Sequence, residues 1–394
     1  MLVSNVGTWM QNVALSWLIY KMTGNDPLYL GFLGLAFALP MVFVPPFGGA
    51  VADRVDRVRL LFVTQSASLA LATLLAALTW SGAIRPWHIL TTTFAGALLL
   101  AFDNPARQSL VPELVPKEAL QNALSLNAAT FTGAALVGPA IAGALLDVVG
   151  AGWLFMANAV SFLAVIFALM GMRGAPSNDD ASAARKAPSR LRDALFGGFT
   201  YAAASPWLMA LLVLSAVGAI FARSYQQLLP VFADDVYRSG PGGYGALLAG
   251  GGAGALVGAI GISSMKNIEH KGRVMIGAGL ALSGSLALFA MVRTLALGVA
   301  LVVTIGIAAT VFTTMIATVI QLRVPGPLRG RVIALYVSTL IGLPSLGALG
   351  SAAVAKYLGS APRAIELGAL VFALAIALAA PAQLRRAPGH AVAK

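Results

Sequence analysis

The sequence contains no cysteine, which excludes disulfide bonds, thiolate metal sites and cysteine nucleophiles. Charge is scarce as well, because Asp, Glu, Lys and Arg make up only 10% of the 394 residues. Acidic side chains are the rarer sign, at 14 against 26 lysines and arginines. The sequence shows no nucleophile–base pairing, nucleotide-binding loop or metal-ligand spacing of its three histidines. We therefore expect neither an enzyme nor a bound cofactor.

Apolar residues dominate what is present, at 59% of the chain with a mean hydropathy of +0.85. Soluble domains average about 45–50% apolar residues. A helix needs roughly 20 apolar residues to cross a bilayer. The sequence predicts an all-α membrane protein with twelve such spans, at 2–22, 28–52, 60–81, 87–106, 121–146, 152–172, 205–225, 243–263, 273–292, 296–320, 332–356 and 364–383.

A polar stretch near the middle of the chain separates six predicted spans from the other six. Its proline, serine and mixed charges are typical of a solvated linker. We predict an N-terminal six-helix half at 1–172, a cytoplasmic linker at 173–193, a C-terminal half at 194–385 and a cytoplasmic tail at 386–394. Two six-span halves are the architecture of a secondary transporter, which binds its substrate near the membrane midplane.

The lysines and arginines predict the orientation of these spans. With both termini in the cytoplasm, 19 of the 26 fall in cytoplasmic joints, as the positive-inside rule requires. Arg223 is one of the others, because span seven is expected to end at 225. The charges sit in short joints rather than on one basic face, so the net charge of +12 does not indicate nucleic-acid binding. The expected partners are the lipid bilayer and a small-molecule substrate, and we expect a monomer.

A short charged segment joins spans two and three and contains Asp53 and Arg57. The Asp53 carboxylate can pair with Arg57 one turn on, and it can face the positive N-terminal end of another helix. Asp103 and Arg107, one turn apart near the end of span four, can extend this cluster. Such contacts are worth about 0.3–1 kcal/mol each, which suits a latch that must also open. The alternative is that these charges only set the topology.

Span five contains glycines at a regular spacing of five, at Gly133, Gly138 and Gly143, together with Pro139. Small residues let helix backbones approach closely in lipid, and proline removes a backbone donor. This pattern predicts close packing between the two halves that seals against proton leak. The alternative is ordinary tight packing without a role in coupling.

Several segments resemble the major facilitator superfamily. Residues 49–59 (GAVADRVDRVR) resemble its signature between spans two and three, and residues 133–143 (GAALVGPAIAG) resemble the glycine–proline motif of its antiporters. Residues 103–108, 114–123 and 323–332 resemble the bacterial branch that includes the enterobactin exporter and macrolide-efflux-type proteins. The resemblance covers essentially the whole chain.

The resemblance implies the major facilitator fold, with twelve transmembrane helices in two pseudo-symmetric halves. It also implies that Asp53 faces the start of span eleven, and that this contact closes the cytoplasmic side in the outward-open state. The conformational gate implied in this way consists of Gly49, Asp53, Arg54, Arg57, Asp103, Arg107 and Arg331. Relatives usually carry a basic, aromatic lead before span one. Its absence after Met1 predicts a short native form or an internal start.

Polar side chains within the spans are candidates for substrate contact, because burying them in lipid is costly. The predicted cavity is lined by Asn5, Thr8, Gln11, Asn12, Asn127, Tyr225, Gln226 and Tyr336. The alternative for each is an interhelical hydrogen bond. The scarcity of charge in this set argues against a strongly charged substrate.

We therefore predict a secondary active transporter of the bacterial inner (plasma) membrane that exports hydrophobic or amphipathic molecules of the drug or siderophore type. Proton antiport with alternating access is expected, driven by the proton gradient. No Asp or Glu lies at the middle of a predicted span, so the coupling group is Asp53 or Asp103, or the protein is a facilitator without ion coupling. The alternative functions are an importer or facilitator of a small polar nutrient and a membrane enzyme or sensor that kept a transporter fold.

Overall fold

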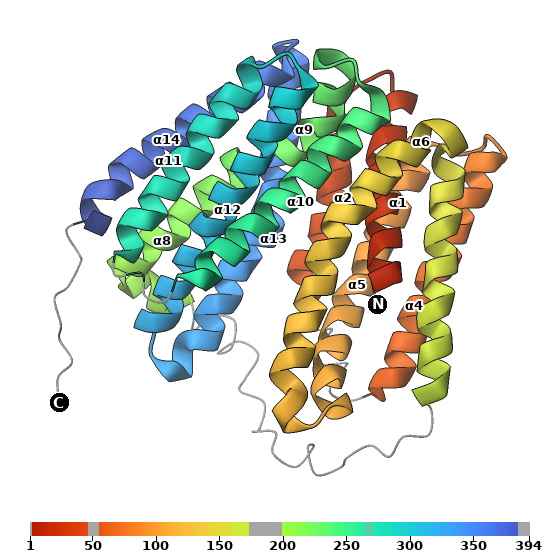
Figure 1. Cartoon of the computed structure of the whole chain (residues 1–394), viewed down its shortest axis with the longest axis horizontal. Coiled ribbons are helices and arrows are strands. Elements are labelled where there is room, and N and C mark those ends of the chain that lie inside the picture. The colour runs from red at the N-terminus through yellow and green to blue at the C-terminus, as the bar shows by residue number, and fades with distance from the viewer. Residues whose placement is uncertain (1, 46–54, 173–198, 266–267, 269, 385–394) are drawn as a thin grey trace. The chain divides into compact units, whose positions relative to one another are not determined.

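The computed structural model describes residues 2–45, 55–172, 199–265, 268 and 270–384. Helices make up nearly all of these residues, and none of them forms a strand (Figure 1). The predicted gate residues Gly49, Asp53 and Arg54 lie outside the described residues, as do the predicted linker at 173–193 and the tail at 386–394.

The described residues fall into two compact units. The first unit lies within Met1–Ala187 and Leu229–Ala249, and the second within Pro188–Leu228 and Gly250–Lys394. The stretch 229–249 therefore packs with the first unit, although the predicted halves assign it to the second. The boundaries of the predicted halves stay a prediction.

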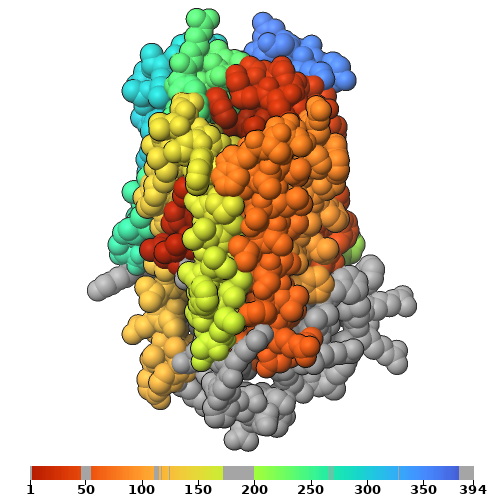
Figure 2. Space-filling view, turned by 90° about the vertical axis from the view of Figure 1, so that its right-hand side faces the viewer, coloured from red at the N-terminus to blue at the C-terminus, as the bar shows by residue number. Residues whose placement is uncertain are grey.

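The helices of the first unit come mainly from the N-terminal part of the chain. They are α1 (Leu2–Met22), α2 (Pro27–Phe43), α4 (Arg57–Trp80), α5 (Pro86–Leu114), the short 3-10 helix η1 (Lys117–Ala119) and α6 (Leu120–Met172). α1 packs along α6, and α4 packs against both α5 and α6. Figure 2 shows α4 (orange) and the second arm of α6 (yellow-green) side by side on one face.

The remaining elements follow the predicted linker in the chain. They are α8 (Pro206–Val217), the π-helix η3 (Gly218–Ala222), α9 (Tyr225–Val231), the π-helix η4 (Phe232–Val236), α10 (Gly240–Ser264), α11 (Lys271–Met291), α12 (Leu295–Arg323), α13 (Gly326–Tyr357) and α14 (Ala361–Leu384). In the second unit, α11 packs against α12 and α14.

Among the described residues, eight helical stretches are long and apolar enough to cross a membrane. They are Arg57–Trp80, Leu120–Gly171, Pro206–Val236, Gly240–Ser264, Lys271–Met291, Leu295–Arg323, Leu328–Tyr357 and Ala361–Ala380. The prediction of an all-α membrane protein is confirmed, and the count of twelve spans stays a prediction.

Local sequence explains where several helices begin and turn. Asp26 caps α2 by accepting the backbone N–H of Leu28, and Asp56 caps α4 by accepting that of Arg59 at 2.6 Å. Gly150 has φ 79°, a left-handed conformation that glycine adopts without strain. The chain reverses direction there, so α6 consists of two arms that match the two predicted spans (Figure 1).

One predicted boundary is wrong. Span seven does not end at 225, because one apolar helical stretch runs from Pro206 to Val236 and encloses Arg223. Arg223 interrupts the run of apolar residues, yet the helical stretch continues beyond it to Val236. The apolar stretch of α13 begins at Leu328, within four residues of the predicted start of span eleven, and Arg331 lies in the second turn of this helix.

Candidate functional site

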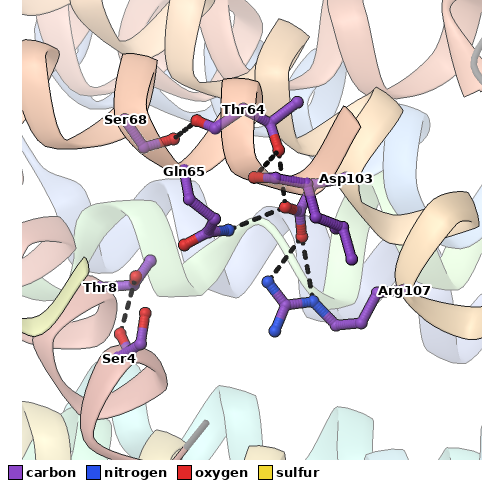
Figure 3. Close-up of polar contacts among 8 residues, drawn as sticks. Ser4, Thr8, Thr64, Gln65, Ser68, Asp103 and Arg107 are labelled. Atoms are coloured by element: carbon purple, nitrogen blue, oxygen red, sulfur yellow. Dashed lines mark hydrogen bonds and ion pairs between the residues drawn. The ribbon is translucent and has the colours of Figure 1, made fainter. Parts of the chain in front are cut away.

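A buried carboxylate joins α4 and α5 in the first unit (Figure 3). The Asp103 side chain is 5% exposed, and its Oδ2 accepts from Arg107 Nη2 at 2.8 Å and Nε at 3.0 Å. Its Oδ1 accepts from Gln65 Nε2 at 2.7 Å and from the Thr64 hydroxyl at 2.9 Å. Four donors therefore compensate the carboxylate, which is how a charge is accommodated in a low-dielectric interior.

Apolar side chains shield this cluster from water. Leu61, Ala106, Leu110 and Leu169 form a buried group around the turn of α5 that carries Arg107. Ionic contacts are stronger where water is excluded. Gln65 Oε1 is buried without a hydrogen-bond partner, because the amide nitrogen must point at Asp103. Sequence reasoning found Asp103 and Arg107 but missed Thr64 and Gln65, which carry no motif.

Two of the three motif glycines of α6 lie in close contacts. A Cβ on Gly138 would lie 2.5 Å from the Trp9 Cβ, so α1 and α6 approach there to backbone distance. A Cβ on Gly143 would lie 2.8 Å from the Gly245 Cα of α10. Gly133 has open space around it. Close packing is thus present at Gly138, where both helices belong to the predicted N-terminal half, and at Gly143, and it is absent at Gly133. Packing of this motif between the two halves as a seal against proton leak stays a prediction.

The predicted polar face of α1 divides in two. Gln11 accepts from Asn158 Nδ2 of α6 at 2.8 Å, which is an interhelical hydrogen bond. Thr8 and Asn12 are exposed and Asn5 is half-buried. The Thr8 hydroxyl donates to the Ser4 carbonyl of its own helix. Asn158 is a polar partner that the sequence analysis missed.

The predicted cavity residues on later helices also differ in their surroundings. Asn127 is half-buried in the first arm of α6, and Gln226 is exposed on α9. Tyr225 is buried, with its ring edge-on to Phe289 at a centroid distance of 6.3 Å. The buried Tyr336 donates its hydroxyl to the Thr313 carbonyl at 2.8 Å. The assignment of these residues to a substrate cavity stays a prediction.

A second charged cluster, which the sequence analysis missed, joins the end of α1 to η4. Lys21 Nζ lies 2.8 Å from Asp234 Oδ2, and the Tyr20 hydroxyl donates to Asp235 Oδ2 at 2.7 Å. Asn25, with φ 63°, donates to Asp234 Oδ2 at 2.9 Å. These contacts attach η4 to the first unit. Only the adjacent pair of aspartates at the end of an apolar stretch signalled this cluster in the sequence.

Comparison with known families agrees with this architecture. The model of the transmembrane secretion effector family matches residues 1–393. The chain therefore belongs to this family of the major facilitator superfamily, and it is a multi-pass bacterial membrane protein. Members of this superfamily are membrane transporters rather than enzymes, as predicted from the sequence.

Individual relatives make the comparison more specific. The chain is 32% identical to the staphyloferrin A transporter of Staphylococcus aureus over 167 residues, which span 42% of each protein. It is 24% identical to the multidrug efflux pump Tap of Mycolicibacterium fortuitum over 352 residues, 86% of this chain and 83% of Tap. The match to the staphyloferrin A transporter thus spans less than half of that relative, whereas the match to Tap spans most of it.

Solved structures share the fold at low sequence identity. A bacterial homologue of the human lysosomal transporter Spinster, in an inward-facing and unoccupied conformation, superimposes with a TM-score of 0.72 at 15% identity and covers 98% of this chain and 94% of its own. A bacterial homologue of the iron transporter ferroportin gives a TM-score of 0.71 at 16% identity, with 98% and 97% covered. These similarities establish the fold alone.

Proposed function

We propose that this protein exports hydrophobic or amphipathic small molecules of the drug or siderophore type by alternating access, in exchange for protons. The observation that carries the proposal is the match to Tap, named a multidrug efflux pump, over 86% of the chain. The family description, transmembrane secretion effector, points in the same direction. The match to the staphyloferrin A transporter supports the siderophore type.

The proposal includes a topology of twelve spans in two six-helix halves, with both termini in the cytoplasm of the producing cell. The positive-inside count and the positions of the helices support it. It also includes a functional monomer, because the two predicted halves of one chain suffice to form a substrate pathway between them.

Asp103 and Arg107 belong to the proposed cytoplasmic gate. Their ion pair fixes the guanidinium of Arg107 on α5, and Gln65 and Thr64 hold the carboxylate from α4. A side chain held in this way offers a defined charge to the segment before α4, which begins at Arg57. Gly49, Asp53, Arg54 and Arg331 complete the gate in this proposal.

The proposal is tested by expression in an efflux-deficient bacterial host. Cells that produce the protein should accumulate less of at least one hydrophobic dye or drug in a panel than cells with an empty vector. A protonophore should abolish the difference. Extrusion that continues unchanged in the presence of the protonophore would contradict proton antiport. Increased accumulation of a polar nutrient, without extrusion of any panel compound, would favour the importer.

The α6 glycines provide a matched pair of variants for the coupling step. Gly138→Leu places a side chain against Trp9 and should reduce extrusion at least tenfold, because α1 and α6 can no longer approach. Gly133→Leu points into open space and should extrude normally. Both variants need comparable amounts in the membrane, measured by immunoblot. Equal extrusion by the Gly138→Leu and Gly133→Leu variants would indicate that the motif serves ordinary helix packing without a role in coupling.

A further inference from the structure

Arg223 belongs to the second unit and lies in the interior of an apolar helical stretch. The stretch Pro206–Val236 has 31 residues, and an 18-residue segment of it has a mean hydropathy of 1.8. Arg223 is two residues past its middle, which at 1.5 Å per residue is about 3 Å along the helix axis. An arginine at this depth costs about 2.5 kcal/mol or more, so such residues mark functional sites by default.

The guanidinium of Arg223 has no compensating partner among the described residues. No hydrogen bond or ion pair to its side chain is present there, and the side chain is half-buried. Its backbone N–H is satisfied, since it donates to the Gly218 carbonyl at 3.1 Å. The Arg223 guanidinium is therefore a planar cation whose five N–H donors lack an acceptor among the described residues. A carboxylate or a similar oxyanion matches the geometry of these donors.

The backbone that carries Arg223 is irregular and tightly held. Arg223 and Ser224 form a turn between the π-helix η3 and α9. A Cβ on Gly347 of α13 would overlap the carbonyl of Ile220, and one on Gly368 of α14 would lie 2.7 Å from the carbonyl of Phe221. π-helical turns inside α-helices are frequent at functional sites. This packing fixes the position of Arg223 relative to α13 and α14.

Three polar residues that the sequence analysis assigned to the cavity belong to the same unit as Arg223: Tyr225, Gln226 and Tyr336. Tyr225 is two residues after Arg223 in the chain, and both Tyr225 and Tyr336 are buried. The backbone N–H of Gln226 donates to the Arg223 carbonyl at 3.3 Å, so the exposed Gln226 amide lies one turn further along. The Tyr336 hydroxyl is already used, since it donates to the Thr313 carbonyl at 2.8 Å, so Arg223 supplies the charged donor of this region. Tyr225, Gln226 and Tyr336 were singled out by the sequence, and Arg223 was not.

We propose that Arg223 binds an anionic group, a carboxylate or equivalent oxyanion, of the transported molecule. This inference rests on the proposed transport function and narrows its substrate class to amphipathic organic anions. It reverses the expectation that a charged substrate is disfavoured. In this assignment the anionic group of the substrate contacts Arg223, and a neutral analogue of the substrate lacks that contact.

Binding of two matched probes to the purified full-length protein in detergent tests this proposal. The probes are radiolabelled 2-naphthoate and 2-naphthamide, which share a ring system and differ in charge, and equilibrium dialysis measures their affinities. The wild type should bind naphthoate at least tenfold more tightly than naphthamide, as expected for one charge-assisted contact. Arg223→Gln should remove this preference and leave naphthamide affinity unchanged. Arg223→Lys should keep part of it.

Arg363→Gln serves as the matched control, because Arg363 is exposed at the start of α14. It should keep the full preference for naphthoate. A wild type that binds the two probes equally, or binds neither, would overturn the proposal, as would an Arg223→Gln variant that keeps the preference. If Arg223→Gln does not fold, the wild-type preference and its reduction in Arg223→Lys decide the question. The two proposals fail separately. If the purified protein binds naphthoate through Arg223 but cells that produce it extrude no panel compound, the result contradicts the proposed export and not the binding site.

Discussion

Asp103 in the first unit and Arg223 in the second are both charged residues inside long helices, but their surroundings are opposite. Asp103 meets four donors from three side chains and is nearly inaccessible. Arg223 is half-buried and has no hydrogen-bond or ion-pair partner among the described residues. A compensated charge stabilises a structure only while its partners stay in place. An uncompensated one leaves binding capacity for a ligand, and this contrast separates a structural contact from a candidate binding group.

Removing Asp103 should have the largest effect. Asp103→Leu leaves the Arg107 guanidinium without its carboxylate and should destabilise the protein by about 3–5 kcal/mol. The measurement is thermal or denaturant unfolding of the purified protein in detergent. The double variant Asp103→Leu/Arg107→Leu should recover more than half of this loss. A double variant as unstable as Asp103→Leu would show that the charge pair is not the source of the stability.

The Gln65 amide should contribute less, because Asp103 retains three other donors. Gln65→Leu removes one hydrogen bond to a charged acceptor but also removes the unpartnered Oε1. We expect a net loss of about 1 kcal/mol in the same unfolding measurement. Ser68→Ala is the control, because the Ser68 hydroxyl donates only to the Thr64 carbonyl of its own helix. Equal losses for the two variants would remove Gln65 from the cluster.

The ion pair between Lys21 and Asp234 is a third case, because it is partly exposed to solvent. The Lys21 side chain is 44% exposed, so water and salt screen the pair. Lys21→Met should cost about 0.5 kcal/mol at low ionic strength and nothing measurable in 1 M salt. The comparison of unfolding at the two salt concentrations measures this difference. A loss that persists unchanged in 1 M salt would mean that Lys21 acts through packing of its methylene chain.

Replacing Arg223 should have the smallest effect on stability. Arg223→Leu removes an uncompensated charge, so its free energy of unfolding should equal or exceed that of the wild type. The same variant should lose the preference for 2-naphthoate. A loss comparable to that of Asp103→Leu would break the contrast, since it would place Arg223 in an internal structural contact.

Hydropathy located the membrane helices well, because lipid offers backbone groups no partner and every span must satisfy its own hydrogen bonds. α11, α12 and α14 lie within a few residues of their predicted ranges. The motif residues Asp103, Arg107 and Gly138 also lie in close contacts. The failure at span seven has a clear reason: hydropathy alone treats Arg223 as the end of a helix, while the backbone turns and continues.

The sequence did not predict which side chains contact the predicted site residues. Helical periodicity tells which side chains share a face, but it does not tell which helix that face meets. Gln65 and Asn158 carry no motif, and only the packing of α4 on α5 and of α1 on α6 brings them to Asp103 and Gln11. Gly133 and Gly138 have the same spacing pattern, yet only Gly138 meets another helix.

The sequence by itself determined the class of this protein: an all-α membrane protein of the major facilitator superfamily. Composition, span length and local motifs depend on neighbours in the chain and on the bilayer, so they can be read directly. The tertiary structure decided which charges are compensated. Asp103 is held and Arg223 is left open because compensation depends on side chains from other helices, and their positions follow from packing rather than from order along the chain.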